Sequence, residues 1–371
     1  MIRGRRTAGL GRFAREVAST VALHVVLATI SGALLFSLID LIEVGNIADR
    51  ISGEDLWRLS LVSVPRILRM MMPIAAPLGT VTAIGTLVRR REIEAFFAAG
   101  AHPTALLPAV ISVGLVMAVL HAANQEWLVP PASSELSQLR RKMGLTSGPL
   151  ELFSRRQSWI RGQDLLYRVH SLADRAGRVV EGVLILRLDQ GRLVDRWDVE
   201  RLEHHDGRWI GREIVHRIFG EDGRLTTERI DEAPLQLGEE PRDFVTNIAA
   251  PDRLSLRELA ETTERRARLG RTTAGHVLEL HRRAAVPLGL LLAMALAAAL
   301  GLRLGRQPSL ARALGVGSLV GLAVWVSREI SSLLGETGAL PAGIAGWNTA
   351  IALVALAVLV WARAARRGIA D

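Results

Sequence analysis

Few residues in this sequence have the types and spacing that catalysis requires. The run from His204 to Asp206 carries metal-binding side chains, but it falls at an expected hairpin turn and no second ligand motif accompanies it. His276 and Glu279 would share a helical face, with His281 nearby, yet their spacing differs from the His-Glu-x-x-His pattern of zinc proteases. Polar packing at the start of a helix is the favoured interpretation there. We therefore predict no catalytic residue and no metal site.

Composition excludes further kinds of chemistry. Lys142 is the only lysine in the chain, and it lies in Arg-Arg-Lys-Met rather than in the Gly-x-x-x-x-Gly-Lys-Ser/Thr loop that binds nucleotide phosphates. The chain has no cysteine, which excludes disulfide bonds, thiolate catalysis and cysteine metal ligands. The formal charge of +9 comes almost wholly from arginine, and little aromatic interleaving accompanies it, so we expect no nucleic-acid partner. No cofactor is expected.

Arginines within or beside apolar stretches are the residues best suited to bind a charged ligand. They are Arg66, Arg69, Arg282, Arg283 and Arg328. Few acids lie near them in the sequence, with Glu329 beside Arg328 as the main exception. An arginine at the centre of a bilayer costs about 2.5 to 3.5 kcal/mol, and less where it can snorkel to an interface. Snorkelling is one interpretation. The other is a ring that receives a phosphorylated lipid headgroup, because a guanidinium can donate two parallel hydrogen bonds to phosphate.

Membrane-spanning helices must position these arginines. Hydrophobic residues make up 49% of the chain and the mean hydropathy is +0.26, which is too apolar for an ordinary soluble protein. A span crosses roughly 30 Å of hydrocarbon at about 1.5 Å per residue. Six apolar segments are long enough, at about residues 17–41, 61–87, 103–123, 284–302, 310–334 and 342–362. Pro65, Pro73 and Pro77 should bend the second segment.

The other arginines predict the orientation of these spans. Basic clusters within 3–15, 89–91, 303–312 and 363–367 would all lie on one side of the membrane. By the positive-inside rule that side is the cytoplasm, so both termini are expected there. The chain between the third and fourth spans would then lie on the opposite side, which is the periplasm in a Gram-negative envelope.

An all-β domain is expected between the third and fourth spans. Short runs rich in β-branched and aromatic residues alternate with turn sequences such as Asp-Gly, and the expected strands are 165–169, 179–188, 193–202 and 209–219. We predict a sandwich or jelly roll. A capping box from Ser255 to Glu258 then starts a polar helix that leads to the fourth span. The predicted domains are 1–129, 130–254 and 255–371.

A short amphipathic helix is expected between the second and third spans, at about residues 89–100. Its distinctive residues are Glu92, Glu94, Phe96, Phe97 and Gly100. The phenylalanines recur with Ile93 at helical spacing, while charged residues crowd the start of the segment. One interpretation is a helix that rests among the lipid headgroups. The other is a helix that docks into a groove of a partner protein and transmits force.

Small residues recur at helical spacing in the fifth span, as Ala311-x-x-x-Gly315 and Gly317-x-x-x-Gly321. Such residues let another helix approach closely. Helix packing is one interpretation. A gate that opens sideways into lipid, packed through Gly317 and Gly321, is the other.

These features together resemble the LptF/LptG family of lipopolysaccharide-export permeases over nearly the whole chain. The matching runs are Pro65-Arg66 to Pro73 leading into Glu92-x-x-Ala-x-x-Ala-x-Gly100, Glu279 to Arg283 leading into Pro287, and Pro341 to Asn348. The resemblance implies a non-catalytic subunit of an ATP-binding-cassette exporter in the bacterial inner membrane. It would pair with a homologous permease and a cytoplasmic ATPase dimer. It would extract lipopolysaccharide from the outer leaflet and pass it through the β domains to a periplasmic bridge protein.

The resemblance also assigns roles to residues. Glu92 matches the acidic position that engages the ATPase groove, and Arg66 matches a basic position associated with the lipid's phosphates. The first span lacks the basic residue that some members carry near Phe36 and Ser37, which departs from the LptG-like branch. The run from Glu279 to Arg283 is closer to LptF.

Two other functions fit parts of the pattern. A secondary transporter of another lipid or amphiphile would need an inverted repeat and discontinuous helices, and the two halves of the chain share only their number of spans. A membrane-anchored periplasmic scaffold would need neither the amphipathic segment nor the outer arginines.

Overall fold

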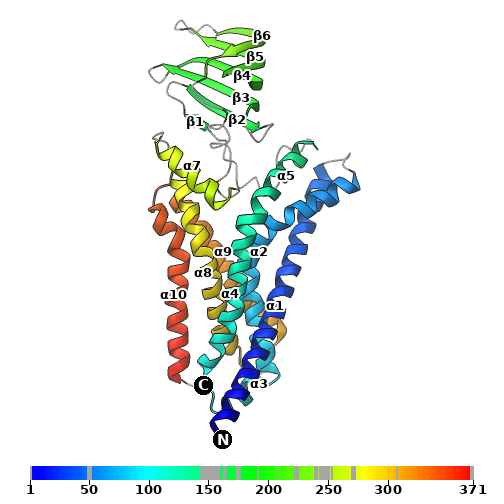
Figure 1. Cartoon of the computed structure of the whole chain (residues 1–371), viewed down its shortest axis with the longest axis vertical. Helices are drawn as coiled ribbons and strands as arrows, with labels where there is room; N and C mark the ends of the chain where they lie inside the picture. The colour runs from blue at the N-terminus through cyan, green and yellow to red at the C-terminus, as the bar shows by residue number, and fades with distance from the viewer. Residues whose placement is uncertain are drawn as a thin grey trace. The chain divides into compact units, whose positions relative to one another are not determined.

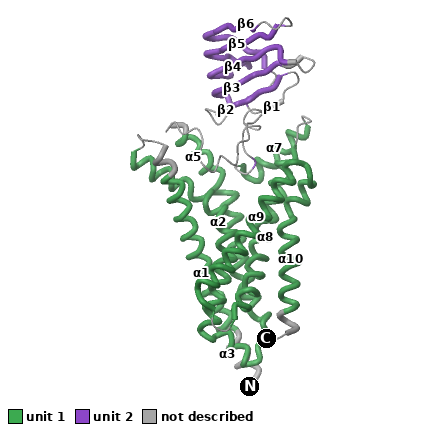
Figure 2. The backbone as a smooth tube through the Cα atoms, turned by 180° about the vertical axis from the view of Figure 1, so that it is seen from behind, with its two compact units in different colours: residues 1–148, 253–371 green, residues 149–252 purple. Residues whose placement is uncertain are grey.

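The chain divides into two compact units in the computed structural model. One unit comprises residues 1–148 and 253–371 and is helical, and the other comprises residues 149–252 and contains the sheet (Figure 2). The structure describes residues 2–47, 52–142, 159–161, 165–172, 177–189, 192–205, 207–220, 225–237, 241, 251, 254–268, 273–305 and 308–367. Each unit has its own apolar core.

Six segments of the helical unit are long and apolar enough to cross a membrane, which confirms the predicted number of spans. Five of them are single helices: α1 (Ile2–Ile47), α2 (Gly53–Arg89), α8 (Ala274–Leu302), α9 (Leu310–Glu336) and α10 (Ala342–Arg367) (Figure 1). The third span is composite and consists of η1 (Pro103–Leu106), α4 (Leu107–Ala123), η2 (Asn124–Leu128) and α5 (Val129–Lys142).

The third span continues beyond the predicted end of the membrane domain at residue 129. Residues 130–142 are helical, whereas short strands were expected from Pro130 onwards. The two prolines at 130 and 131 follow directly on the π-helical turn Asn124–Leu128, inside one continuous helical segment. Leu136 and Leu139 then pack against Leu59 of α2, so an apolar stripe stabilises the extension.

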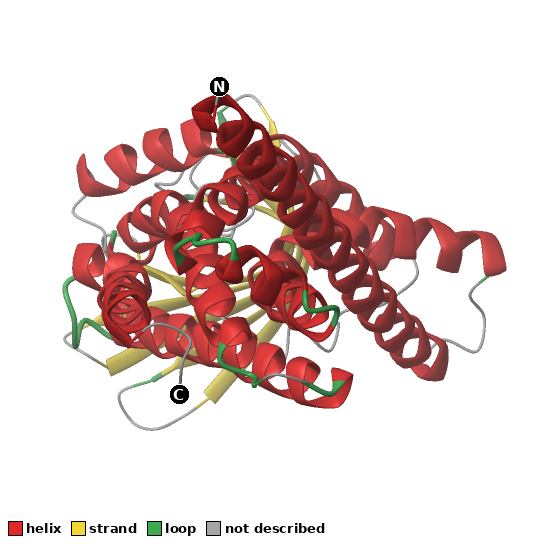
Figure 3. Ribbon diagram, turned by 90° about the horizontal axis from the view of Figure 1, so that it is seen from below, coloured by secondary structure: helices red, strands yellow, loops and turns green. Residues whose placement is uncertain are grey.

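α2 is the central helix of this unit. Of its most apolar stretch 83% is buried, against 61% for α8, 17% for α9 and 11% for α1. α2 contacts α1, α8 and α9, and the view from below shows the long helices packed around one another (Figure 3). The outward faces of α1 and α9 carry exposed apolar side chains such as Leu34 and Leu319. Such faces suit lipid, whereas in water they would be costly to expose.

Glycines bring the backbones of these helices close together. A Cβ atom on Gly79 of α2 would lie 2.5 Å from the Cα atom of Val25 in α1. A Cβ atom on Gly301 of α8 would lie 2.8 Å from the Cβ atom of Ile84 in α2. Close approach increases the number of van der Waals contacts, which drive helix association where the surroundings are as apolar as the helices.

The two ends of the helical unit carry different short elements. The beginning of α1, the end of α10 and the short helix α3 (Glu92–Ala98) lie at one end, and α5 and α7 (Leu256–Arg268) lie at the other (Figure 1). The predicted capping box starts α7. The Ser255 backbone N–H donates to Glu258 Oε2 at 2.7 Å, and the Glu258 N–H donates to Ser255 Oγ at 3.3 Å.

The second unit contains one antiparallel sheet with strands in the order β1-β2-β3-β4-β5-β6. The strands are β1 (Trp159–Arg161), β2 (Leu165–Leu172), β3 (Val179–Asp189), β4 (Arg192–His205), β5 (Arg208–Phe219) and β6 (Leu225–Leu235). The predicted strands correspond to β2 to β5. The described strands form a meander in which every neighbour in the sheet is also a neighbour in sequence, so the predicted jelly-roll topology is not confirmed.

Alternation along the strands builds an apolar core on one face of this sheet. Tyr167, Ile185, Val199 and Ile214 are almost fully buried and pack with further apolar residues of the neighbouring strands. Short turns set the register, and Gly207, with a φ of +78°, occupies the left-handed conformation that the β4–β5 turn requires.

A methyl group at Gly79 should loosen α1 from α2. In Gly79→Ala the added Cβ atom would lie 2.5 Å from the Val25 Cα atom, and overpacking of this kind costs about 1 to 3 kcal/mol. We expect a lower midpoint of thermal unfolding, measured on the purified protein in detergent by circular dichroism.

The matched control is Gly315→Ala in α9, where a Cβ atom meets no heavy atom within 4 Å. Alanine is favoured over glycine in a helix by about 1 kcal/mol. The midpoint of thermal unfolding of this variant should therefore stay the same or rise. Equal losses in the two variants would contradict the packing role of Gly79.

Candidate functional site

Most of the arginines singled out in the sequence meet in one cluster. Arg69 of α2 lies within electrostatic range of Arg283 in α8 and of Arg328 in α9. Arg282 of α8 is also an electrostatic neighbour of Arg328. The cluster therefore draws on helices that are far apart in sequence. His121 of α4, which is buried, faces Arg69 and Arg328 from another side.

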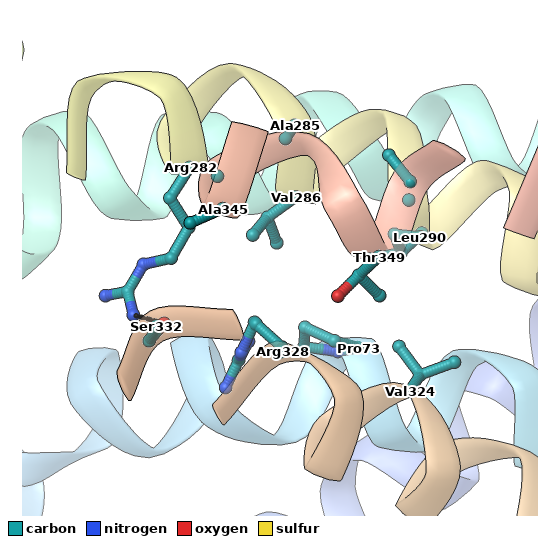
Figure 4. A pocket seen from close by; sticks show the side chains of 13 residues that line it. Pro73, Arg282, Ala285, Val286, Leu290, Val324, Arg328, Ser332, Ala345 and Thr349 are labelled. Carbon is teal, nitrogen blue, oxygen red and sulfur yellow. Dashed lines mark hydrogen bonds between the residues drawn. The ribbon is translucent and has the colours of Figure 1, made fainter. Parts of the chain in front are cut away.

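Arg282 and Arg328 line a cavity between α2, α8, α9 and α10. Its empty space is about 440 Å³, including the open side. Figure 4 shows both side chains at this cavity, and Arg282 Nη1 donates to Ser332 Oγ at 3.3 Å. Apolar side chains make up much of the remaining wall, including Pro73, Val286, Leu290 and Val324. A charged rim beside an apolar wall suits an amphiphile.

Acidic residues offset much of this positive charge, although the sequence suggested that few acids lay nearby. Glu279 Oε2 lies 2.6 Å from Arg282 Nη2, and Glu279 Oε1 lies 3.4 Å from Arg283 Nε. Glu329 pairs with Arg328 at 3.2 Å. The expectation failed because Glu279 is one helical turn from both Arg282 and Arg283, and a membrane helix places such residues on one face.

Arg283 is held by several groups of the protein itself. Its Nη1 lies 3.6 Å from Glu126 Oε2, and its Nη2 donates to the Leu254 carbonyl oxygen. Glu126 also accepts the backbone N–H of Leu256 at 2.8 Å. Arg283 and Glu126 thus clamp the beginning of α7. The clamp depends on the π-helical turn Asn124–Leu128, which contains Glu126 and widens the third span at this point.

Arg66 approaches an acidic residue of α1. Its Nη2 lies 3.8 Å from Asp40 Oδ2 of α1, and Arg140 Nη2 of α5 lies 3.6 Å from Asp40 Oδ1. Asp40 and Arg140 are both buried. Arg66 therefore takes part in a charged cluster with Asp40 and Arg140 at the ends of α1 and α5.

The segment between the second and third spans forms α3, whose aromatic face turns towards the helical unit. Ile93 is buried, the ring of Phe96 stacks on that of Phe13 in α1 at 3.8 Å, and Phe97 packs against the apolar core. Arg91 precedes the helix in a left-handed conformation with a φ of 60°. Glu92 and Glu94 are half-buried, whereas Gly100 is exposed. The surface left for a partner is the charged start of α3 together with the small residues Ala95, Ala98 and Ala99.

Gly317 and Gly321 form the seam between α9 and α2. A Cβ atom on Gly317 would lie 2.9 Å from the Leu78 Cα atom, and one on Gly321 would lie 2.6 Å from the Ile74 carbonyl oxygen. Gly315, by contrast, is exposed. Of the two small-residue motifs, only the second lies in a close helix contact.

A comparison with family models extends these observations to function. Residues 15–363 match the model described as Lipopolysaccharide export system permease LptF/LptG, which covers nearly the whole chain. The chain belongs to the LptF/LptG family. LptF/LptG permeases are non-catalytic transmembrane subunits of an ABC transporter, and this one is accordingly a multi-pass membrane protein. A search of the curated proteins found no match.

The histidines considered as metal ligands have other contacts in the permease. The ring of His204 packs edge-on against Trp209 at 4.9 Å, and His281 Nδ1 accepts the indole N–H of Trp347 at 3.2 Å. His276 is buried at the start of α8. Within the part of the chain that the structure describes, no three His, Asp or Glu side chains come together as a metal site.

Sequence reasoning missed Asp40, Glu126 and Arg140. Asp40 stands at the end of the first apolar segment, and Arg140 fell in the region expected to form the all-β domain. An ionisable residue on an otherwise apolar helix is itself a signal of a buried partner. It does not say which distant residue the partner is.

Removing the Glu126 side chain should loosen the beginning of α7. Glu126→Ala would take away both the acceptor for the Leu256 N–H and a partner of Arg283. Hydrogen bonds to charged groups contribute about 1.5 to 3 kcal/mol, so amide hydrogen exchange in the first turn of α7 should accelerate by about tenfold or more. Glu126→Gln keeps an acceptor and should show a smaller effect.

The matched control is Glu261→Ala on the exposed face of α7, where Glu261 pairs only with Arg257 among the described residues. Exchange in the first turn should change little in this variant. If Glu126→Ala exchanges at the parent rate, the clamp does not hold α7.

Proposed function

We propose that this permease extracts lipopolysaccharide from the outer leaflet of the bacterial inner membrane and passes it through its sheet-containing unit to a periplasmic bridge protein. It pairs with a homologous permease, and a cytoplasmic ABC ATPase dimer supplies the energy. The observation that carries the proposal is the arginine-rimmed cavity, which lies at a distance from α3 along the same helices. A phosphorylated amphiphile matches a charged rim with an apolar wall.

Arg69, Arg282 and Arg328 are the proposed contacts for the lipid's phosphates in the cavity. Arg282 and Arg328 line it, and Arg69 is close enough to Arg328 to add to the same field. Arg283 has a positioning role, since Glu126, Glu279 and the Leu254 carbonyl already surround it. Arg66 contributes to a separate contact with the headgroup.

The proposed orientation places both termini and α3 in the cytoplasm and the inserted β unit in the periplasm. The beginning of α1, α3 and the end of α10 share one end of the helical unit (Figure 1). The arginines at 89–91 immediately precede α3 at this end. The inserted chain leaves through α5 and returns through α7, which both lie at the other end. This arrangement agrees with the positive-inside rule.

α3 is the proposed contact with the ATPase. Glu92 and Glu94 lie in its first turn, and a charged pair at a protein interface fixes both orientation and partner choice. Phe96 connects this helix to α1 through its stack on Phe13. A displacement of α3 by the ATPase would therefore reach α1 directly.

The proposed lateral gate includes the seam of α9 on α2. Gly317 and Gly321 provide a close but largely apolar contact, and α9 is otherwise exposed along most of its length. A seam of small residues contains no buried charge pair that would have to break before the helices separate.

Neutralising the cavity arginines should weaken lipid binding and export. In the double variant Arg282→Gln with Arg328→Gln, the lipid's phosphates lose charge-assisted hydrogen bonds that contribute about 1.5 to 3 kcal/mol each. We expect photocrosslinking to lipopolysaccharide to fall by about tenfold or more. Lysine at both positions should restore binding only in part, because lysine keeps the charge but loses the two-pronged geometry.

The matched control is Arg312→Gln, an exposed arginine near the opposite end of α9. It should crosslink lipid as the parent does. Unchanged crosslinking in the double variant would mean that the cavity arginines are snorkelling anchors rather than lipid contacts.

Reversing the charge of Glu92 should uncouple ATP hydrolysis from transport. Glu92→Arg would replace a negative charge by a positive one at a contact that is expected to be partly desolvated. The protein should still insert into the membrane. The measurement is ATPase activity and lipid release in the reconstituted transporter. The control is Glu336→Arg, which reverses an exposed charge at the far end of α9. Normal transport by Glu92→Arg would rule out the coupling role.

A further inference from the structure

One buried carboxylate on α8 is shared by two neighbouring arginines. Glu279 Oε2 lies 2.6 Å from Arg282 Nη2, and Glu279 Oε1 lies 3.4 Å from Arg283 Nε. The three residues fall within about one helical turn, which brings their side chains together. The Glu279 side chain is 7% exposed, so little water is present to replace either arginine. A change at one arginine therefore alters what the carboxylate offers the other.

The two arginines serve different parts of the helical unit. Arg282 lines the cavity and donates to Ser332 Oγ of α9 at 3.3 Å. Arg283 donates to the carbonyl oxygen of Leu254. Leu254 is the first described residue after the inserted unit of residues 149–252. Glu279 thus stands between the cavity and the point where the chain returns to the helical unit.

Glu279 and Glu126 compete for the guanidinium of Arg283. Arg283 Nε lies 3.4 Å from Glu279, and Arg283 Nη1 lies 3.6 Å from Glu126. Both distances exceed the roughly 2.7 to 3.2 Å of a well-formed N–H···O hydrogen bond. The contact of Glu279 with Arg282 is much closer, at 2.6 Å. A stronger pull from Glu279 would therefore draw Arg283 away from Glu126.

Glu126 uses one oxygen for both of its contacts. Its Oε2 atom is the one nearest to Arg283, and the same atom accepts the backbone N–H of Leu256 at 2.8 Å. The Glu126 side chain is 34% exposed, so water can solvate it once the arginine withdraws. Without the arginine the carboxylate is less firmly placed, and the first turn of α7 loses a fixed acceptor.

We propose that Glu279 is a positioning residue that couples the cavity to the beginning of α7. While Arg282 engages Glu279, Arg283 stays with Glu126 and the Leu254 carbonyl. An anionic group bound at Arg282 replaces Glu279 there, Glu279 turns to Arg283, and the clamp on α7 loosens. This trigger rests on the function proposed above, whereas the coupling between the side chains does not.

The first experiment needs no lipid. It measures amide hydrogen exchange in the first turn of α7, on the purified chain in detergent. Arg282→Gln leaves Glu279 to Arg283 alone, so this exchange should accelerate by about fivefold. Arg282→Lys keeps a cation beside Glu279 and should exchange close to the parent rate. A parent rate in Arg282→Gln would overturn the coupling.

The decisive comparison repeats the change in the Glu279→Gln background. Without the shared carboxylate, Arg282→Gln should add nothing to the exchange rate of Glu279→Gln. The double variant lacks one charge of each sign, and the thermal midpoints of all variants show that each is folded. An equal acceleration in both backgrounds would mean that Arg282 acts on α7 without Glu279, which overturns the proposal.

The matched control is Arg328→Gln. This change removes the same charge from the same cavity, but Arg328 pairs with Glu329 of its own helix at 3.2 Å. Exchange in the first turn of α7 should therefore stay at the parent rate. An acceleration as large as that of Arg282→Gln would assign the effect to the charge of the cavity and overturn the role of Glu279.

The second experiment tests the trigger with lipopolysaccharide in the same detergent. Added lipid should accelerate exchange in the first turn of α7 in the parent and leave it unchanged in Glu279→Gln. If the variants behave as expected but the lipid has no effect on the parent, the trigger is overturned and the coupling stands. The export function is tested separately by crosslinking in the cavity, so the two proposals can fail independently.

Discussion

A buried arginine must find an anionic partner, and this requirement shapes much of the helical unit. Arg282 and Arg283 meet Glu279, Arg283 also meets Glu126, and Arg140 meets Asp40. Each pair joins residues that share a helix face or lie on different helices. Burying one such charge alone would cost several kcal/mol, so the pairs constrain how the helices align.

The same constraint explains why arginines with similar sequence contexts differ in role. Arg283 is enclosed by protein acceptors and holds the beginning of α7, whereas Arg282 and Arg328 reach the wall of a cavity. A guanidinium that is enclosed by acceptor groups of the protein has little to offer a ligand. One whose donors face a cavity or lack acceptors can exchange a weak internal partner for a better one.

Close helix packing complements these charged contacts. Glycines bring α1 and α9 against α2 at separations that no side chain would allow, while their outer faces remain apolar and exposed. α3 is joined to α1 through the stacked rings of Phe13 and Phe96. Mechanical input at α3 therefore has a direct path to α1, which is mostly exposed and lies close to Arg66 and Arg140 at its far end.

The sequence by itself determined the number of spans, most strands of the sheet, the capping box of α7 and membership of a permease family. These follow from local patterns, because hydropathy over about 20 residues, period-two alternation and turn chemistry depend on neighbours in the chain. The sequence also singled out the arginines and the segment at 89–100. It misplaced the end of the third span, because two adjacent prolines resemble a break unless the π turn before them is known.

Only the tertiary structure decided which charges meet. Asp40 and Arg140 lie on the first and third spans, yet Arg140 Nη2 is 3.6 Å from Asp40 Oδ1. Glu126 reaches Arg283 because a π-helical turn widens the third span. Likewise, the phenylalanines of α3 face their own helical unit because Phe13 supplies a ring at the right distance. Such pairings depend on helix rotation and close packing, which no local pattern encodes.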